Sequence, residues 1–595
     1  MRWPQLGYPG SGVVQCCTLA GLVIIAALPR KGEPGSNSAA WLGAAFFIYL
    51  VVRWLAAGAP SVGNDGFGTL SQATAWAAVS YWLRSSAEGD LRRRMDFALL
   101  RIIALVALAC GIHAFAQYFW IYDRAYAALQ ESIGTAQPTP LQVGLLHHFQ
   151  LRRVASVWGD PNILAGFCAM SLAASGTLAS GLFSRGDGEP AKRVRIFDGV
   201  LGISAIAAAA VAIILSGSRG GMLEAVVLIA VALIWVVMRR RSPRHNAGVA
   251  ILFVCTLLVT TPGVPQPPES HTQSAWTWRS NTIAERANYF HVGAAMFQES
   301  PVFGLGVGSV DLYFGRFKPP QARESKYLHN WVLQLLAETG LVGFLLGSAF
   351  LVALFWNGAR RSELRSPGTR AVWIIGALFV LDALVQLSFN HREMMALFGI
   401  CAGVLLANGS RPKAGRWVAE LRWGFAGALV LAMAIFVMPA LKALHYRQQA
   451  TDMIEQGRAA ETEHLLRTAQ NWEPRNPVNY LRLAQSKEAA GQLSSARLLV
   501  EEALKRQPES AAAHAALATV QQKLGEWKAA ESELQEALQR YPANAAYNGQ
   551  MAQLLVQRGR KAEALKYARK AAEFSPGVAG AEHWPAFYEA LKSSK

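Results

Sequence analysis

A histidine–asparagine pair stands in the stretch YLHNWVLQLLAETG, residues 327–340, where a basic and aromatic segment runs into a long apolar run. Polar groups at the mouth of a membrane helix are costly to bury, so the pair either caps a helix or takes part in chemistry. The imidazole of His329, with an ordinary pKa of about 6.5, would suit the removal of a proton from an incoming hydroxyl group. Taken on its own, His329 equally fits a polar residue at a helix start, so both roles stay open.

Several arginines accompany this histidine in segments that we expect on the same side of a membrane. Arg219 lies in SGSRGG, where the glycines allow close backbone approach, and Arg286 lies in TIAERANYF. Guanidinium groups bind phosphate oxygens bidentately, so arginines beside a histidine suit a substrate that carries a diphosphate. Arg219 alone also fits an arginine whose charge reaches the membrane interface. Other polar residues predicted to contact the substrate are Asn162, Arg279, Arg323, Asn330, His391 and Arg392.

The elements that must position these residues are predicted to be membrane helices. Of the 595 residues, 52% are hydrophobic and 16% are charged, whereas soluble domains have about 25% charged residues. Apolar runs of bilayer-spanning length recur over the first 440 residues, and we count about twelve of them. The predicted spans are 13–29, 37–55, 68–84, 95–121, 161–183, 197–217, 221–238, 247–262, 331–357, 371–389, 393–408 and 418–440.

The formal net charge of +18 does not indicate a nucleic-acid-binding protein. Lys and Arg gather in short loops between alternate apolar runs, such as Arg92–Arg94 and Arg239–Arg241, as expected of cytoplasmic loops. Three segments then lie outside the cytoplasm, together with the C-terminal region: residues 122–160, 216–221 and 263–330. The six cysteines all fall in predicted spans, and none has the spacing of a metal site or a disulfide framework.

The long outer loop at about 263–330 combines aromatic residues with cations, which suits sugar stacking and phosphate contact. The same composition also suits a helix that lies on a membrane surface, so the two interpretations stay open. Within it, SNTIAERANYFHVGAAMFQES predicts an amphipathic helix that Ser280 would cap. The residues predicted to share one face of this helix are Ala287, Phe290, Ala294 and Phe297.

From about residue 446 the sequence repeats every 34 residues. Pro474, Pro508, Pro542 and Pro576 follow this period, as do Gly457, Gly491, Gly525 and Gly559. Small residues in two further registers would let helix pairs approach closely. The pattern resembles tetratricopeptide repeats, in which antiparallel helix pairs stack into a curved solenoid. We therefore predict an all-α chain with a polytopic membrane domain at 1–445 and a repeat domain at 446–595, which would bind a protein partner or act as a spacer.

Three motifs in the membrane region resemble the O-antigen ligase and polymerase superfamily. They are SGSRGG, then ERANYFHVGAAMFQESPVFGLGVGSVDLYF, then YLHNWVLQLLAETGLVGFLL, which together cover about 215–346. In that family an Arg-Gly-Gly turn precedes an outer loop with an arginine and a P-x-x-G-x-G-x-G run. A His-Asn pair then opens a helix that continues into Glu-x-Gly. DPNILAGF resembles a further element upstream.

The resemblance implies a membrane glycosyltransferase with a GT-C-like helical architecture in a bacterial inner membrane, acting at its outer face. Arg219 and Arg286 would bind the diphosphate of a polyprenyl-diphosphate-linked glycan, and His329 would activate the acceptor. The acceptor would be a lipid, a glycan or a protein, and neither a metal ion nor another cofactor is expected. Glu338 is expected to pack or to form hydrogen bonds.

Two other classes of protein remain to be compared with a transferase. A transporter or flippase of lipid-linked sugars also suits twelve spans, and Asp382, with Gln386 one turn later, is the clearest acidic residue within a span. A scaffold built around the repeat domain would need only one span. The ordered set of motifs favours the transferase.

Overall fold

The structure is a computed structural model whose described residues form helices joined by turns and loops. It describes residues 38–56, 89–134, 152–183, 189–239, 282–319, 325–359, 366–384, 388–407, 458–474, 476–575 and 583–593, with scattered positions between them. Those in the first 407 residues are α2 (Ser38–Ala56), α4 (Gly89–Ala116), η1 (Gln117–Ile121), α5 (Tyr122–Ile133), η2 (Ser156–Trp158), α7 (Pro161–Ala179), η3 (Ser180–Phe183), α8 (Glu189–Ser216), α9 (Arg219–Arg239), α12 (Thr282–Glu299), α13 (Ser309–Phe317), α14 (Trp331–Gly358), α15 (Pro367–Asp382), η5 (Ser388–Asn390) and α16 (Arg392–Leu406).

Four helices in the described part of the chain are long and apolar enough to cross a membrane. They span Asp90–Ile133, Pro161–Leu182, Lys192–Ser216 and Trp331–Trp356, and a shorter apolar helix spans Glu393–Leu406. The first one continues past the predicted end at 121, because the wide turn η1 joins α4 to α5 without a break. The predicted spans 13–29, 247–262 and 418–440 lie outside the described residues, and 68–84 is described only at scattered positions.

The predicted span 371–389 is placed differently in the structure. Helix α15 begins at Pro367, in the first turn where proline is favoured, and ends at Asp382. There the Asp382 carboxylate accepts a hydrogen bond from the Gln386 side chain at 2.6 Å and another from the Ser388 hydroxyl. These bonds fold the chain into a tight turn, so the last seven residues of the predicted span lie outside the helix.

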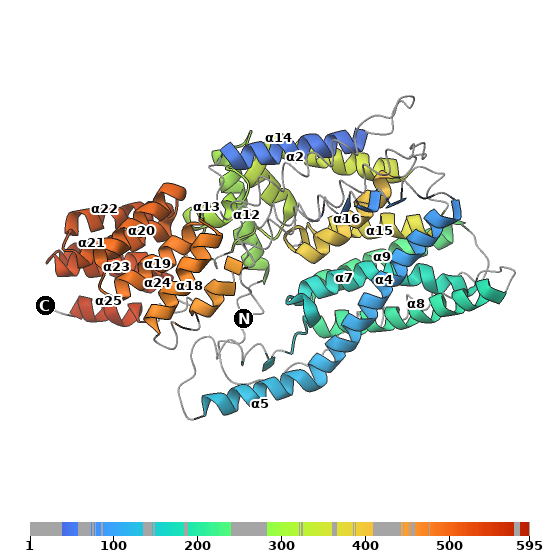
Figure 1. The fold of residues 1–595 in the computed structure, drawn as a ribbon, viewed down its shortest axis with the longest axis horizontal. Helices are drawn as coiled ribbons and strands as arrows, with labels where there is room; N and C mark the ends of the chain where they lie inside the picture. The colour runs from blue at the N-terminus through green and yellow to red at the C-terminus, as the bar shows by residue number, and fades with distance from the viewer. Residues whose placement is uncertain are drawn as a thin grey trace.

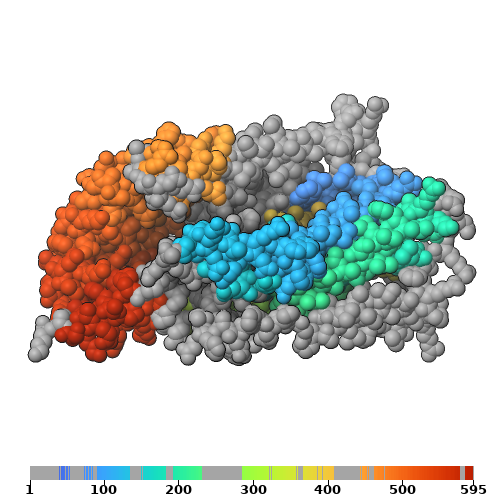
Figure 2. Space-filling model, turned by 90° about the horizontal axis from the view of Figure 1, so that it is seen from below, coloured from blue at the N-terminus to red at the C-terminus, as the bar shows by residue number. Residues whose placement is uncertain are grey.

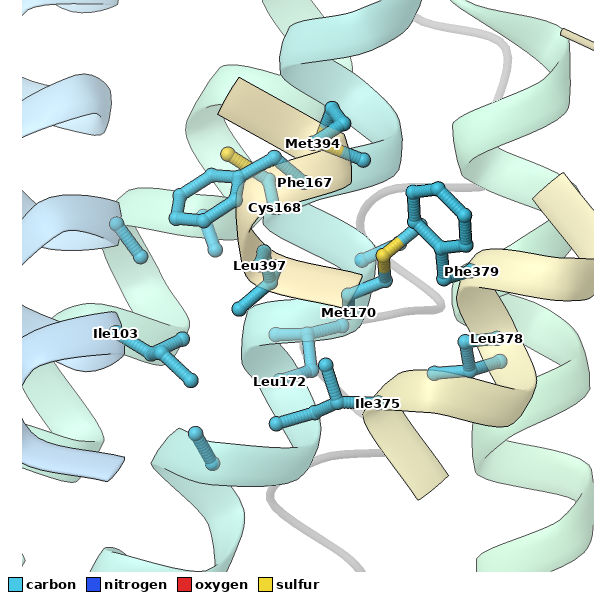
Figure 3. Close-up of a cluster of buried hydrophobic side chains, with 14 of the residues drawn as sticks. Ile103, Phe167, Cys168, Met170, Leu172, Ile375, Leu378, Phe379, Met394 and Leu397 are labelled. Carbon is cyan, nitrogen blue, oxygen red and sulfur yellow. The ribbon is translucent and has the colours of Figure 1, made fainter. Parts of the chain in front are cut away.

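Helix α7 is the central helix of the membrane region. It is apolar on all sides, and 13 of its residues are buried, which is typical of a helix surrounded by others. Figure 3 shows its Phe167, Met170 and Leu172 among side chains from α4, α15 and α16. Small residues permit the closest approaches, since a Cβ on Gly202 of α8 would lie 2.4 Å from the Ser175 carbonyl oxygen.

The C-terminal helices form the predicted tetratricopeptide array at one end of the molecule (Figures 1 and 2). Its turn glycines Gly491, Gly525 and Gly559 have φ values of +74°, +79° and +73°, so each turn uses the left-handed conformation that favours glycine. The small residues Ala469, Ala503, Ala537 and Ala571 are all fully buried. The helices of the array are α18 (Ala459–Trp472), α19 (Pro477–Ala489), α20 (Leu493–Arg506), α21 (Ala511–Lys523), α22 (Trp527–Arg540), α23 (Ala545–Gln557), α24 (Lys561–Phe574) and α25 (Trp584–Ser593).

Candidate active site

His329 occupies a strained position at the start of α14. Its φ is +51°, a left-handed conformation that costs an L-residue about 1–2 kcal/mol. The next residue, Asn330, caps α14 by accepting a hydrogen bond from the Leu333 amide at 2.9 Å, and it donates to the Leu384 carbonyl at 2.7 Å. The preceding Leu328 is 1% exposed. A buried neighbour on one side and a doubly bonded cap on the other therefore hold His329 in this conformation.

The ring of His329 stacks on Tyr289 of α12. The ring centroids are 4.9 Å apart and the planes are inclined by 12°. Burial lowers the pKa of His329 to about 4; the charge of Asp160 opposes this shift, and that of Arg286 adds to it. The imidazole is consequently neutral at physiological pH, which is the form that can accept a proton.

Two histidines and two charged residues from four segments lie close enough for charge to affect the histidine pKa values. The charges of Asp160, before α7, and of Arg286, on α12, both affect the pKa of His329. The pKa of His391, just before α16, is lowered by burial and raised again in part by Asp160. Arg286 is exposed, so its guanidinium group is open to a ligand. The site thus combines a neutral imidazole, an accessible cation and a capping carboxylate.

Arg219 is the first residue of α9 and is exposed. The neighbouring Gly220 borders the turn after α15, because a Cβ on Gly220 would lie 3.0 Å from the Gln386 amide nitrogen. The same turn supplies the Leu384 carbonyl that binds Asn330. The start of α9, at Arg219, and the residues just before α14, at His329, therefore border the same turn.

Asn162 is the second residue of α7. Asp160 caps this helix, accepting a hydrogen bond from the Asn162 amide at 2.6 Å. The Asn162 side chain accepts one from Arg153 at 3.2 Å, and Arg153 also donates to the Ser216 carbonyl at 3.0 Å, before α9. On the other side, Gln117 in η1 accepts hydrogen bonds from the amides of residues 155 and 156. Arg153 thus ties the start of α7 to the end of α8.

The P-x-x-G-x-G-x-G run at 301–308 and the Glu-x-Gly at 338–340, the two glycine motifs, contact each other through their backbones. Gly304, with φ of +69°, lies against α14 so closely that a Cβ on it would be 2.3 Å from the carbonyl carbon of Glu338. The Gly306 amide donates to the Glu338 carbonyl at 2.9 Å, and Gly340 interrupts α14 with φ of +64°. The Glu338 carboxylate accepts from the amides of Gly308 and Val310 at the start of α13. Glu338 therefore anchors α13 onto α14.

The comparisons with known proteins find matches in two regions of the chain. Residues 204–347 match the family described as O-Antigen ligase (Wzy_C). The chain contains an O-antigen ligase domain. This domain runs from α8 into α14 and includes Arg219, Arg286 and His329. Residues 453–520 and 515–579 match two tetratricopeptide-repeat families, as expected from the period of 34.

Two of the solved structures that are similar to part of the chain are the following. MamA 41-end from Desulfovibrio magneticus RS-1 is 18% identical, with 25% of this chain and 85% of that chain covered and a TM-score of 0.22. A thermophilic TPR protein in Thermus thermophilus is 22% identical, with 30% and 94% covered and a TM-score of 0.23. A search of curated proteins finds no match.

Some of the predicted site residues lie together in the structure, and others are described in part or lie outside the described residues. His329, Arg286 and His391 share one electrostatic environment with Asp160, and Asn330 and Asn162 are held in helix starts beside it. Arg279 and Arg323 lie outside the described residues, and Arg392 is described only as the first residue of α16.

The sequence motifs assigned no individual role in the site to Tyr289, Arg153 or Asp160. For Tyr289 a usable signal was present, since it lies three residues after Arg286 and seven before Met296, on the buried side of α12. The predicted apolar face of α12 is therefore wrong. Phe290 on that face is 53% exposed, whereas Val292 and Met296 on the opposite face are fully buried. Ser280, the predicted cap, lies outside the described residues.

A buried pair of acidic residues lies where α9 meets α15. Glu224 of α9 is 6% exposed and interacts with Asp382 of α15, which is fully buried. Gly166 makes room for this pair, because a Cβ there would be 3.0 Å from Asp382 Oδ1. Asp382 thus fixes the turn whose carbonyl groups bind the start of α14.

Proposed function

We propose that the chain is a membrane glycosyltransferase that moves an oligo- or polysaccharide from a polyprenyl-diphosphate donor to an acceptor hydroxyl. The observation that carries the proposal is the strained, neutral His329, with the exposed Arg286 within electrostatic reach and Arg219 at the adjoining helix start. The match of residues 204–347 to the O-Antigen ligase family supports it. The acceptor is a lipid, a glycan or a protein.

In the proposed reaction, His329 removes the proton from the acceptor hydroxyl while the oxygen attacks the anomeric carbon of the donor sugar. A new glycosidic bond forms, and the bond between that carbon and the diphosphate oxygen breaks. The leaving polyprenyl diphosphate keeps the electron pair, and Arg219 and Arg286 stabilise its charge. The imidazolium then gives its proton to water, so the enzyme returns to its starting state.

The proposed setting is the outer face of a bacterial inner membrane, crossed by about twelve helices. The array would lie on the same outer side as His329. In support of this, α13, which belongs to the segment around His329, packs directly against α22 of the array. A bilayer does not fit between two helices that are in contact, which supports placing the array on the same side as His329.

The experiment that tests this function measures release of polyprenyl diphosphate by the full chain in lipid nanodiscs. The donor is a pool of polyprenyl-diphosphate oligosaccharides, and the acceptor is a crude envelope fraction. We expect release by the wild type and none above background by His329→Ala. His291→Ala is the matched control, since this exposed histidine lies on α12 and is not part of the proposed site.

For the arginines, Arg219→Ala should reduce release strongly, whereas Arg193→Ala, an exposed arginine near the start of α8, should leave it unchanged. Equal release by wild type and His329→Ala would contradict the proposal. Donor binding without any release by the wild type would instead favour transport of the lipid-linked sugar.

A further inference from the structure

Among the described residues, Tyr541 of the array lies directly against α13 of the O-antigen ligase domain. Tyr541 directly follows α22, and its ring covers Gly315 of α13: a Cβ on Gly315 would lie 2.5 Å from Cγ of the tyrosine. Gly315 is buried, and Lys318 Nζ lies 5.4 Å from the centroid of the Tyr541 ring. Only glycine permits this ring to approach the helix so closely.

Charged groups surround this contact. Arg540, beside Tyr541, forms an ion pair with Glu509 at 3.2 Å. Burial, followed by the charge of Glu509, raises the pKa of Tyr313 on the facing side of α13. Arg316 of α13 pairs with Glu299 at the end of α12, at 3.0 Å. Aromatic packing surrounded by partly exposed ion pairs is typical of a specific interface.

Tyr541 lies against the backbone of Gly315, and from the preceding residue, Phe314, packed side chains lead to His329. Phe314, the neighbour of Gly315, is 2% exposed and belongs to a small core formed by α12, α13, α14 and the segment before α14. The Phe314 ring centroid is 6.1 Å from that of Tyr289, and Tyr289 stacks on His329. Leu328, the residue before His329, is part of the same core.

Helix α13 needs support from both of its sides. It has nine residues, and isolated helices shorter than about 12–15 residues are marginally stable in water. On one side of α13, Val310 and Phe314 pack against α12 and α14. On the other side, α22 and Tyr541 cover it. A strained residue such as His329 persists only where its surroundings hold it firmly.

We propose that Tyr541 is a positioning residue for transfer: by docking the array on Gly315 it holds Tyr289 against His329, so the array completes the active site. This inference rests on the proposed glycosyl transfer for its effect on turnover. Its effect on the imidazole does not depend on any reaction, and the two can be measured separately.

The test titrates the histidines of the full chain in lipid nanodiscs by NMR, with His329→Ala to assign the His329 signal. We expect Tyr541→Ala to raise the pKa of His329 from about 4 towards its ordinary value, because the unstacked ring becomes hydrated. Gly315→Val should do the same from the other side of the interface by displacing Tyr541. Tyr588→Ala, an aromatic deletion in α25 at the far end of the array, should leave the titration unchanged.

In the release assay, we expect Tyr541→Ala to lower kcat about tenfold or more with little change in the KM for the donor, because Arg219 and Arg286 remain. An unchanged His329 titration in both interface variants would overturn the proposal, even if the acceptor KM rose, since the array would then only recruit the acceptor. If the His329 titration shifts in the interface variants while the wild type releases no polyprenyl diphosphate, the positioning role is upheld and glycosyl transfer is rejected.

Discussion

The rings of Tyr289 and His329 lie 4.9 Å apart and nearly parallel, at 12°. Tyr289 comes from α12 and His329 from the residue pair before α14, so their contact joins the helix that carries Arg286 to the candidate base. The stack buries one face of the imidazole and fixes the plane in which its nitrogen atoms point.

Replacing Tyr289 should weaken catalysis without abolishing donor binding. An aromatic pair contributes about 0.5–1.5 kcal/mol beyond the area it buries, which corresponds to a loss of up to about tenfold in rate. We expect this loss in kcat for Tyr289→Leu and near-wild-type kcat for Tyr289→Phe, which keeps the ring. The measurement is steady-state release of polyprenyl diphosphate, and equal rates for the two variants would contradict a role for the stack.

The low pKa of His329 predicts the pH dependence of the reaction. The neutral imidazole is the active base, so kcat/KM for the donor should stay level at neutral pH and fall as the pH drops through about 4. A bound diphosphate places negative charge near the imidazole and raises its pKa, so kcat should begin to fall at a higher pH than kcat/KM. An acidic limb at the same pH in both profiles would show that no anion binds near His329.

The same pKa affects stability. In the unfolded chain the histidine has its ordinary pKa of about 6.5, so that state binds the proton more readily than the folded one between about pH 6.5 and 4. Stability from this group is therefore fully present above about pH 6.5 and decreases as the pH falls to about 4. His329→Ala should show a smaller loss of thermal stability over this range.

Gly304 should tolerate no side chain. Its left-handed φ of +69° costs other residues about 1–2 kcal/mol, and a Cβ would meet the α14 backbone at 2.3 Å, an overpacking that costs about 1–3 kcal/mol more. We expect Gly304→Ala to lower the thermal unfolding temperature clearly. Gly181→Ala is its control, because nothing lies within 4 Å of a Cβ there; similar unfolding temperatures for both variants would contradict the contact between the glycine motifs.

Asp382 separates transfer from transport. Its carboxylate accepts hydrogen bonds from Gln386 and Ser388 and so shapes the turn that binds Asn330. Asp382→Asn keeps one acceptor oxygen, so we expect diphosphate release to fall only a few-fold, about the effect of one weakened hydrogen bond. Loss of all activity in Asp382→Asn, with His329→Ala still active, would instead favour an ion-coupled transporter.

Local features of the sequence determined much of this protein. The period of 34 residues predicts the array, because each repeat packs only on its neighbours and each position has the same task in every repeat. Apolar runs predict membrane helices, because backbone groups in lipid must bond within their own segment. The motifs around Arg219, Arg286 and His329 likewise identified the O-antigen ligase domain, since short segments carry them.

Contacts between distant segments were decided only by the tertiary structure. Tyr289 meets His329 across 40 residues, Gly304 meets Glu338 across a helix, and Tyr541 meets Gly315 between two domains. Such pairs follow no period, and a tyrosine on a helix has the same local preferences whether it faces lipid, solvent or a histidine. The buried face of α12 was missed for this reason: both of its faces carry aromatic residues, and only packing against α13 and α14 selects between them.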